Sequence, residues 1–169
     1  MSVRKMTLLA LYATISLAIY AAESILPPPV PIPGIKLGLA NIITLILLRR
    51  YSLREAALVL TVRILLSALL FGQAVSLFYS LSGGFLSLLV MFLFCRLFQK
   101  RMLFLVGAVG GLTHNLGQLL AAYALTRAAS VLAYLPFLIL SGVLTGLFTG
   151  LAAFWADRYL PTRLTGDLK

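Results

Sequence analysis

This 169-residue chain is too apolar for a soluble domain, since 62% of its residues are hydrophobic and 11% are charged, whereas soluble domains carry about 25% charged residues. Its 14 Lys and Arg residues, against four acidic ones, lie in short clusters between apolar runs, a pattern of membrane topology that excludes nucleic acid as a partner. The single cysteine, Cys95, excludes an intrachain disulfide and a zinc site built on thiolates. We therefore predict one multi-pass domain, 1–169, in the plasma membrane.

Six apolar runs follow one another, at residues 7–26, 34–48, 53–71, 74–98, 102–125 and 131–155. A helix needs about 20 residues to cross the hydrocarbon core, so the second run is short for a span. Prolines between 27 and 33 break the helix after the first run because proline has no amide hydrogen to donate. The first run is longer than that of a signal peptide and lacks a clean cleavage site. These runs predict an all-α integral membrane fold, a bundle of six transmembrane helices.

The basic residues predict that both termini are cytoplasmic. With the N-terminus inside and six alternating spans, the outer side holds only Lys36 and Arg127, and Arg63 falls inside the membrane. The inner side then holds Arg4, Lys5, Arg49, Arg50, Arg54, Arg96, Lys100, Arg101, Arg158, Arg163 and Lys169. Because Lys and Arg are retained on the cytoplasmic side, this bias favours both the orientation and an even number of spans.

Small residues recur every four positions along two of the runs, and such ladders let helices approach closely in lipid. The first run carries Ala10, Thr14, Ala18 and Ala22, and the sixth carries Gly142, Gly146 and Gly150. The fifth run has a small cross-section because it contains four glycines, Gly107, Gly110, Gly111 and Gly117. Each ladder is either an internal helix contact or a docking face for another membrane subunit. We expect the ladder of the first run to be the docking face.

Polar side chains inside the spans share one layer, from the outer surface to the middle of the membrane. Polar groups in hydrocarbon are costly and usually mark function, so we predict a pocket that opens outward. Its cations suit a small, anionic solute. The substrate-binding candidates are Glu23, Lys36, Asn41, Arg63, Tyr79, His114, Asn115 and Gln118, with Ser80 at the same depth.

Each polar residue also has a structural interpretation. Arg63 and Glu23 can form an ion pair. His114, Asn115 and Gln118 can be hydrogen-bonded core residues or bonds between helices. Lys36 can extend its ammonium group to the interface.

Motifs for catalysis are missing from the sequence. There is no GxxxxGK[ST] phosphate loop. No two of the four acids, Glu23, Glu55, Asp157 and Asp167, are close enough in sequence to form a carboxylate cluster for magnesium diphosphate. We expect no metal, no cofactor and no catalysis by this chain alone.

Two segments carry a family resemblance. Residues 33–42, PGIKLGLANI, and residues 110–118, GGLTHNLGQ, resemble the small membrane family called Gx transporters, which is also labelled heptaprenyl diphosphate synthase component I and is similar to the S components of energy-coupling-factor transporters. The resemblance implies a six-helix S-component fold that binds a vitamin or precursor from outside. It also implies docking through alanines of the first helix, here Ala10, Ala18 and Ala22, onto a transmembrane coupling subunit driven by two ATPases.

Three functions therefore stay open. The first is a binding and translocation subunit for a small anionic solute, energised by a separate coupling module. The second, implied by the synthase label, is an accessory membrane subunit beside the catalytic subunit of a prenyl diphosphate synthase in menaquinone synthesis, with basic inner loops that recruit that partner. The third is a proton-coupled carrier that works alone through Glu23 and His114.

Overall fold

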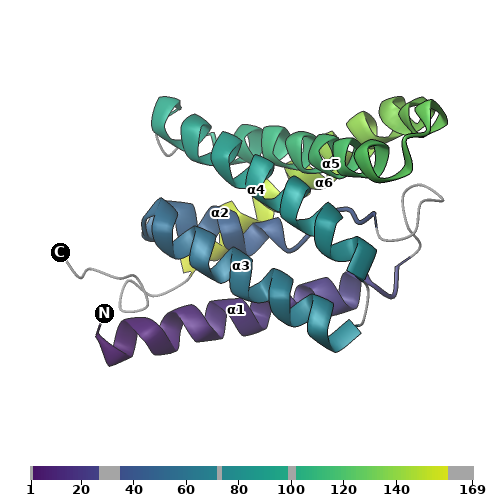
Figure 1. The fold of residues 1–169 in the computed structure, drawn as a ribbon. Coiled ribbons are helices and arrows are strands. Elements are labelled where there is room, and N and C mark those ends of the chain that lie inside the picture. Colours follow the sequence, from purple (N-terminus) through teal and green to yellow (C-terminus); the bar gives the residue numbers. More distant parts are fainter. Residues whose placement is uncertain (1, 27–34, 72–73, 99–101, 160–169) are drawn as a thin grey trace.

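The computed structural model describes residues 2–26, 35–71, 74–98 and 102–159. Over these ranges the chain is helical and contains no strand, as the apolar runs predict. The helices are α1 (Val3–Glu23), α2 (Asn41–Arg50), α3 (Leu53–Phe71), α4 (Ala74–Leu97), α5 (Leu103–Thr126), the 3-10 helix η2 (Ala129–Tyr134) and α6 (Leu135–Tyr159). Figure 1 shows α1 and α3 along one side of the bundle and α4 and α5 along the other.

Four helical segments are long and apolar enough to cross a membrane, namely α1, α4, α5 and the stretch 129–159. The chain is thus a membrane protein by helix length and composition. The predicted second span, 34–48, is wrong as a helix: residues 35–40 are not helical, and α2 begins only at Asn41. Ten helical residues rise about 15 Å, which is half of the hydrocarbon core. The count of six membrane spans and the direction of insertion stay predictions.

Helix α2 lies at the centre of the bundle, where it contacts all five other α-helices. Leu45 and Leu47 have no exposed surface, and Ile43 and Ile46 are also buried. A helix that is covered on every side must be apolar all round, which explains why its sequence shows no polar face. The run 34–48 has the composition of a short membrane span because most of it is buried inside the protein.

Helices α5 and α6 form the closest pair in the bundle. A methyl group added at Gly111 would lie 2.8 Å from Cα of Gly146, and one added at Gly107 would lie 2.6 Å from Cα of Gly150. Both distances are far below an ordinary carbon–carbon contact of about 3.5–4.0 Å. The glycine ladder of the sixth run is therefore an internal contact with α5.

One end of the bundle gathers ionic contacts from four helices. Lys5 of α1 pairs with Glu55 of α3 at 2.5 Å. Arg49 and Arg50 of α2 pair with Asp157 of α6, the Arg50 Nε–Oδ1 distance being 2.8 Å. The start of α1 and the end of α6 consequently lie at the same end of the bundle, as expected for a chain with both termini on one side of a membrane.

Candidate functional site

The central residue of the polar layer is Arg63, which lies near the middle of α3 and is 3% exposed. Its guanidinium carbon lies 5.6 Å from the ring centroid of Tyr20, and its Nε has no hydrogen-bond partner. Within the described part of the chain, no carboxylate lies within ion-pair distance of Arg63. The expected structural pairing of Arg63 with Glu23 is therefore not formed as a contact ion pair, and the two charges interact only over a longer distance.

Glu23, the last residue of α1, is instead bound by the backbone before α2. Its Oε1 accepts the N–H of Gly38 at 2.6 Å, and its Oε2 accepts the N–H of Leu39 at 3.1 Å. Gly38 has φ +83°, in the left-handed region, and a methyl group there would lie 2.6 Å from Cδ2 of His114. Glycine is required at this position for both reasons. Consecutive N–H groups in such a turn form a concave cradle for anions.

Lys36 lies at the rim of this cluster and is half-buried. Its ammonium group lies 3.3 Å from the ring centroid of Tyr20 and binds the hydroxyl of Ser24. Its backbone N–H donates to Oε1 of Gln118 at 3.1 Å. Lys36 therefore joins the segment before α2 to both α1 and α5.

Gln118 and His114 lie one turn apart on α5 and bind each other at 2.8 Å through Nε2 of each. Because the Gln118 oxygen accepts from Lys36, its amide nitrogen is the group that faces His114, and it donates to the ring. This assignment makes the imidazole neutral, with its proton on Nδ1. The hydrogen bond to Gln118 thus holds the His114 ring in one orientation beside the site.

These groups surround a small cavity of about 10 Å³. Its lining residues are Tyr20, Glu23, Lys36, Gly38, Ala40, Asn41, Arg63, Ser80, His114 and Gln118. A cavity of about 10–15 Å³ holds one water molecule. The site is closed around a space too small for an organic solute.

The structure brings together six of the eight candidate residues: Glu23, Lys36, Asn41, Arg63, His114 and Gln118. Asn115 points elsewhere, since its Nδ2 donates to the Leu138 carbonyl at 2.8 Å and so bonds α5 to α6. Tyr79 is buried in a separate apolar cluster with Ile35 and Leu119.

Sequence reasoning did not select Tyr20, Ser80, Gly38 or Ala40 among the site residues. Tyr20 lies about one helical turn before Glu23, so helical spacing from that acid was the signal for it. Ser80 lies at the depth of the predicted layer, beside Tyr79 in the sequence. Gly38 and Ala40 fall within the segment 33–42 that carries the family resemblance, and they contribute backbone and space instead of polar side chains.

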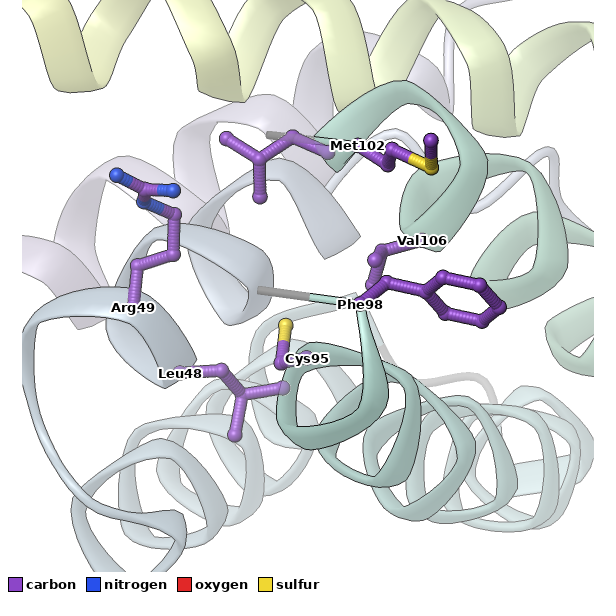
Figure 2. Close-up of a pocket in the computed structure, with 7 residues that line it drawn as sticks. Leu48, Arg49, Cys95, Phe98, Met102 and Val106 are labelled. Atoms are coloured by element: carbon purple, nitrogen blue, oxygen red, sulfur yellow. The ribbon is translucent and has the colours of Figure 1, made fainter. Parts of the chain in front are cut away.

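Two larger hollows lie away from this cluster. One, of about 100 Å³, lies between the ends of α2 and α4 and the start of α5, and Figure 2 shows its lining side chains, including Leu48, Arg49 and Cys95. Because Arg49 is bound to Asp157, its charge is already balanced there. The other, of about 290 Å³, is an apolar groove between α1 and α3 that includes Ala10 and Ala13. A groove of this kind is compatible with lipid and identifies no polar ligand.

The predicted docking ladder of α1 lies on the surface of the bundle. Ala10, Thr14, Ala18 and Ala22 are all exposed, unlike the glycine ladder of α6, which is covered by α5. Its exposure leaves this face of α1 accessible to another membrane helix.

Comparison with known families gives one match. The sequence matches the family described as heptaprenyl diphosphate synthase component I over residues 12–155. This chain belongs to that family. The resemblance to component I is thus confirmed, while the relationship to S components stays a prediction. No curated protein and no solved structure matches the chain.

Proposed function

We propose that this chain is a non-catalytic, multi-pass subunit of heptaprenyl diphosphate synthesis in the plasma membrane. The observation that carries the proposal is the family match over most of the chain. The positions of three carboxylates support it. Glu23 is bound by Gly38 and Leu39, Glu55 by Lys5, and Asp157 by Arg49 and Arg50. Each is thus held by a different part of the bundle, whereas magnesium diphosphate is bound through carboxylates that converge on the metal. We assign the chemistry to a separate catalytic subunit.

The basic end of the bundle is our docking surface for that subunit. Arg54 at the start of α3, Arg96 at the end of α4 and Arg158 at the end of α6 are exposed. They lie at the end where Lys5, Arg49 and Arg50 are already paired with acids. Exposed cations at this end attract a partner with an acidic surface and accelerate its association.

Binding of the purified catalytic subunit to the chain in lipid nanodiscs tests this role. We expect saturable binding that weakens at high salt and weakens further in a variant with Arg54→Gln and Arg96→Gln. Arg127→Gln, an exposed arginine after α5, is the control and should bind as the wild type does. Absence of binding to the wild type at low salt would reject the proposal.

A second function, a binding and translocation subunit for a small anionic solute, is favoured by Arg63. A guanidinium that is 3% exposed inside a membrane bundle is energetically costly when no carboxylate of the described residues lies within ion-pair distance. An anionic ligand offsets that cost by supplying the counter-charge. The exposed α1 ladder then serves as the docking face for a transmembrane coupling subunit with ATPases.

Purification in mild detergent tests this second role. We expect coupling and ATPase subunits to accompany the wild-type chain and to be lost in Ala18→Phe. The control is Leu69→Phe, which places the same ring at an exposed position of another helix, α3, where the native side chain is 78% exposed. If no such subunits accompany the wild type, the second role is wrong.

A further inference from the structure

The polar cavity has more positive than negative charge in its lining. Its lining side chains include one carboxylate, Glu23, and two cations, Lys36 and Arg63, while the hydrogen bond from Gln118 keeps His114 neutral. Lys36 is half-exposed at the rim and is already bound to Ser24 and the Tyr20 ring. Glu23 interacts electrostatically with both cations, so the lining keeps one net positive charge, and one negative charge near the deeply buried Arg63 would balance it.

The cradle that holds Glu23 recognises a carboxylate through backbone groups alone. The N–H groups of Gly38 and Leu39 each bind a different oxygen of the Glu23 carboxylate. Any other carboxylate of the same geometry satisfies these donors equally well. Glu23 is thus a carboxylate attached to α1 that occupies an anion site formed by the segment before α2.

The same contact keeps the cavity closed. Segment 35–40 is held to α1 through Glu23 and through the Lys36–Ser24 bond. It is also held to α5 through Gln118, and to α6 through the Thr145 hydroxyl, which donates to the Leu37 carbonyl at 3.3 Å. The cavity of about 10 Å³ has room for nothing larger than water. A solute enters only when some of these bonds break, and those to Glu23 are the ones that a ligand carboxylate can replace.

We propose that the cavity is the closed form of a site for a solute with a single carboxylate, which binds Arg63 and displaces Glu23 from the N–H groups of Gly38 and Leu39. This inference rests on the solute-binding function proposed above. It specifies that the ligand carries one negative charge, that Arg63 binds this charge, and that Glu23 competes with the ligand for the N–H groups of Gly38 and Leu39. The unpartnered side-chain nitrogen of Asn41 in the lining provides a further donor for the bound solute.

Binding of benzoate to the chain in nanodiscs, measured by calorimetry, tests the inference, with phenyl phosphate as the comparison anion. Removing the internal competitor should strengthen binding, so we expect Glu23→Gln to bind benzoate at least about tenfold more tightly than the wild type, equivalent to one displaced charge-assisted contact. Glu55→Gln is the matched control because it removes the same charge at the opposite end of the bundle and should leave binding unchanged. Phenyl phosphate, which carries up to two negative charges, should bind more weakly than benzoate.

Two further variants separate displacement from a change in charge or a loss of folding. Glu23→Asp keeps the charge but shortens the side chain, so it should also bind benzoate more tightly than the wild type. Adding Arg63→Gln to Glu23→Gln should abolish the gain. The inference is overturned if Glu23→Gln and Glu23→Asp bind no more tightly than Glu55→Gln, if the gain survives loss of Arg63, or if phenyl phosphate binds more tightly than benzoate. Arg63-dependent binding to the wild type without a Glu23 effect would leave the solute-binding function standing.

Discussion

Replacement of Gly111 by alanine should destabilise the bundle, because α5 and α6 meet there backbone to backbone. The added methyl group would lie 2.8 Å from Cα of Gly146 and still closer to the carbonyl of Gly142. Relieving the contact with the Gly142 carbonyl oxygen requires the helices to separate by about 1 Å. Overpacking of this kind costs about 1–3 kcal/mol of unfolding free energy, and neither contacting atom can rotate away.

Gly84→Ala is the matched control for this prediction. Its methyl group would contact the flexible ends of Leu60 at 3.2 Å and Ile64 at 3.4 Å, which can move by a few tenths of an ångström. Because alanine favours helix over glycine by up to about 1 kcal/mol, we expect Gly84→Ala to be neutral or slightly stabilising.

Unfolding of both variants in detergent micelles titrated with sodium dodecyl sulfate, followed by far-UV circular dichroism, gives the comparison. The reasoning is refuted if Gly111→Ala is as stable as Gly84→Ala.

Three other outcomes are expected. Asp157→Asn removes the acid that binds Arg49 and Arg50 and should lower the unfolding free energy by about 1–3 kcal/mol. This loss of stability should be smaller at high salt, and an equal loss at low and high salt would contradict an electrostatic cause. Gln118→Ala removes the acceptor of the Lys36 N–H and should loosen the segment before α2. Alkylation of a cysteine placed at Leu37, in a Cys95→Ser background, should therefore become about fivefold faster. Asn115→Ala removes a bond to α6 instead and should leave the alkylation rate unchanged. In the same background, a membrane-impermeant maleimide applied to intact cells should label a cysteine at Ala128 and spare one at Ser2; labelling at Ser2 would reverse the orientation.

Hydropathy and helix-breaking residues were sufficient to predict most of the fold. The runs 53–71 and 74–98 correspond to α3 and α4 within one residue, because lipid allows only backbone that satisfies its own hydrogen bonds. Helix α2 could not be distinguished from a membrane span, since a helix covered by protein on all sides is as apolar as one in lipid. Hydropathy indicates that a segment is removed from water, but it does not distinguish surrounding lipid from surrounding protein.

The sequence was sufficient to predict the depth of the site residues in the bundle, but not the contacts that they make. Depth along each helix placed Glu23, Arg63 and His114 together, because helical rise converts sequence number into distance. Asn115 and Gln118 lie at nearly the same depth, yet only Gln118 lines the cavity, since three residues along α5 turn the side chain from α6 toward α2. The pairing of Glu23 with backbone N–H groups was also beyond the sequence, because those donors belong to every residue type except proline.

Product analysis with the catalytic subunit tests the central claim, that this chain is an accessory membrane subunit of heptaprenyl diphosphate synthesis. The catalytic subunit is supplied with allylic and homoallylic diphosphates, with empty nanodiscs or with nanodiscs that contain this chain, and the chain lengths of the products are measured. We expect heptaprenyl diphosphate to form efficiently only with the chain present, and Arg54→Gln with Arg96→Gln to reduce that effect. The same rate and the same distribution of chain lengths with empty nanodiscs would contradict the claim.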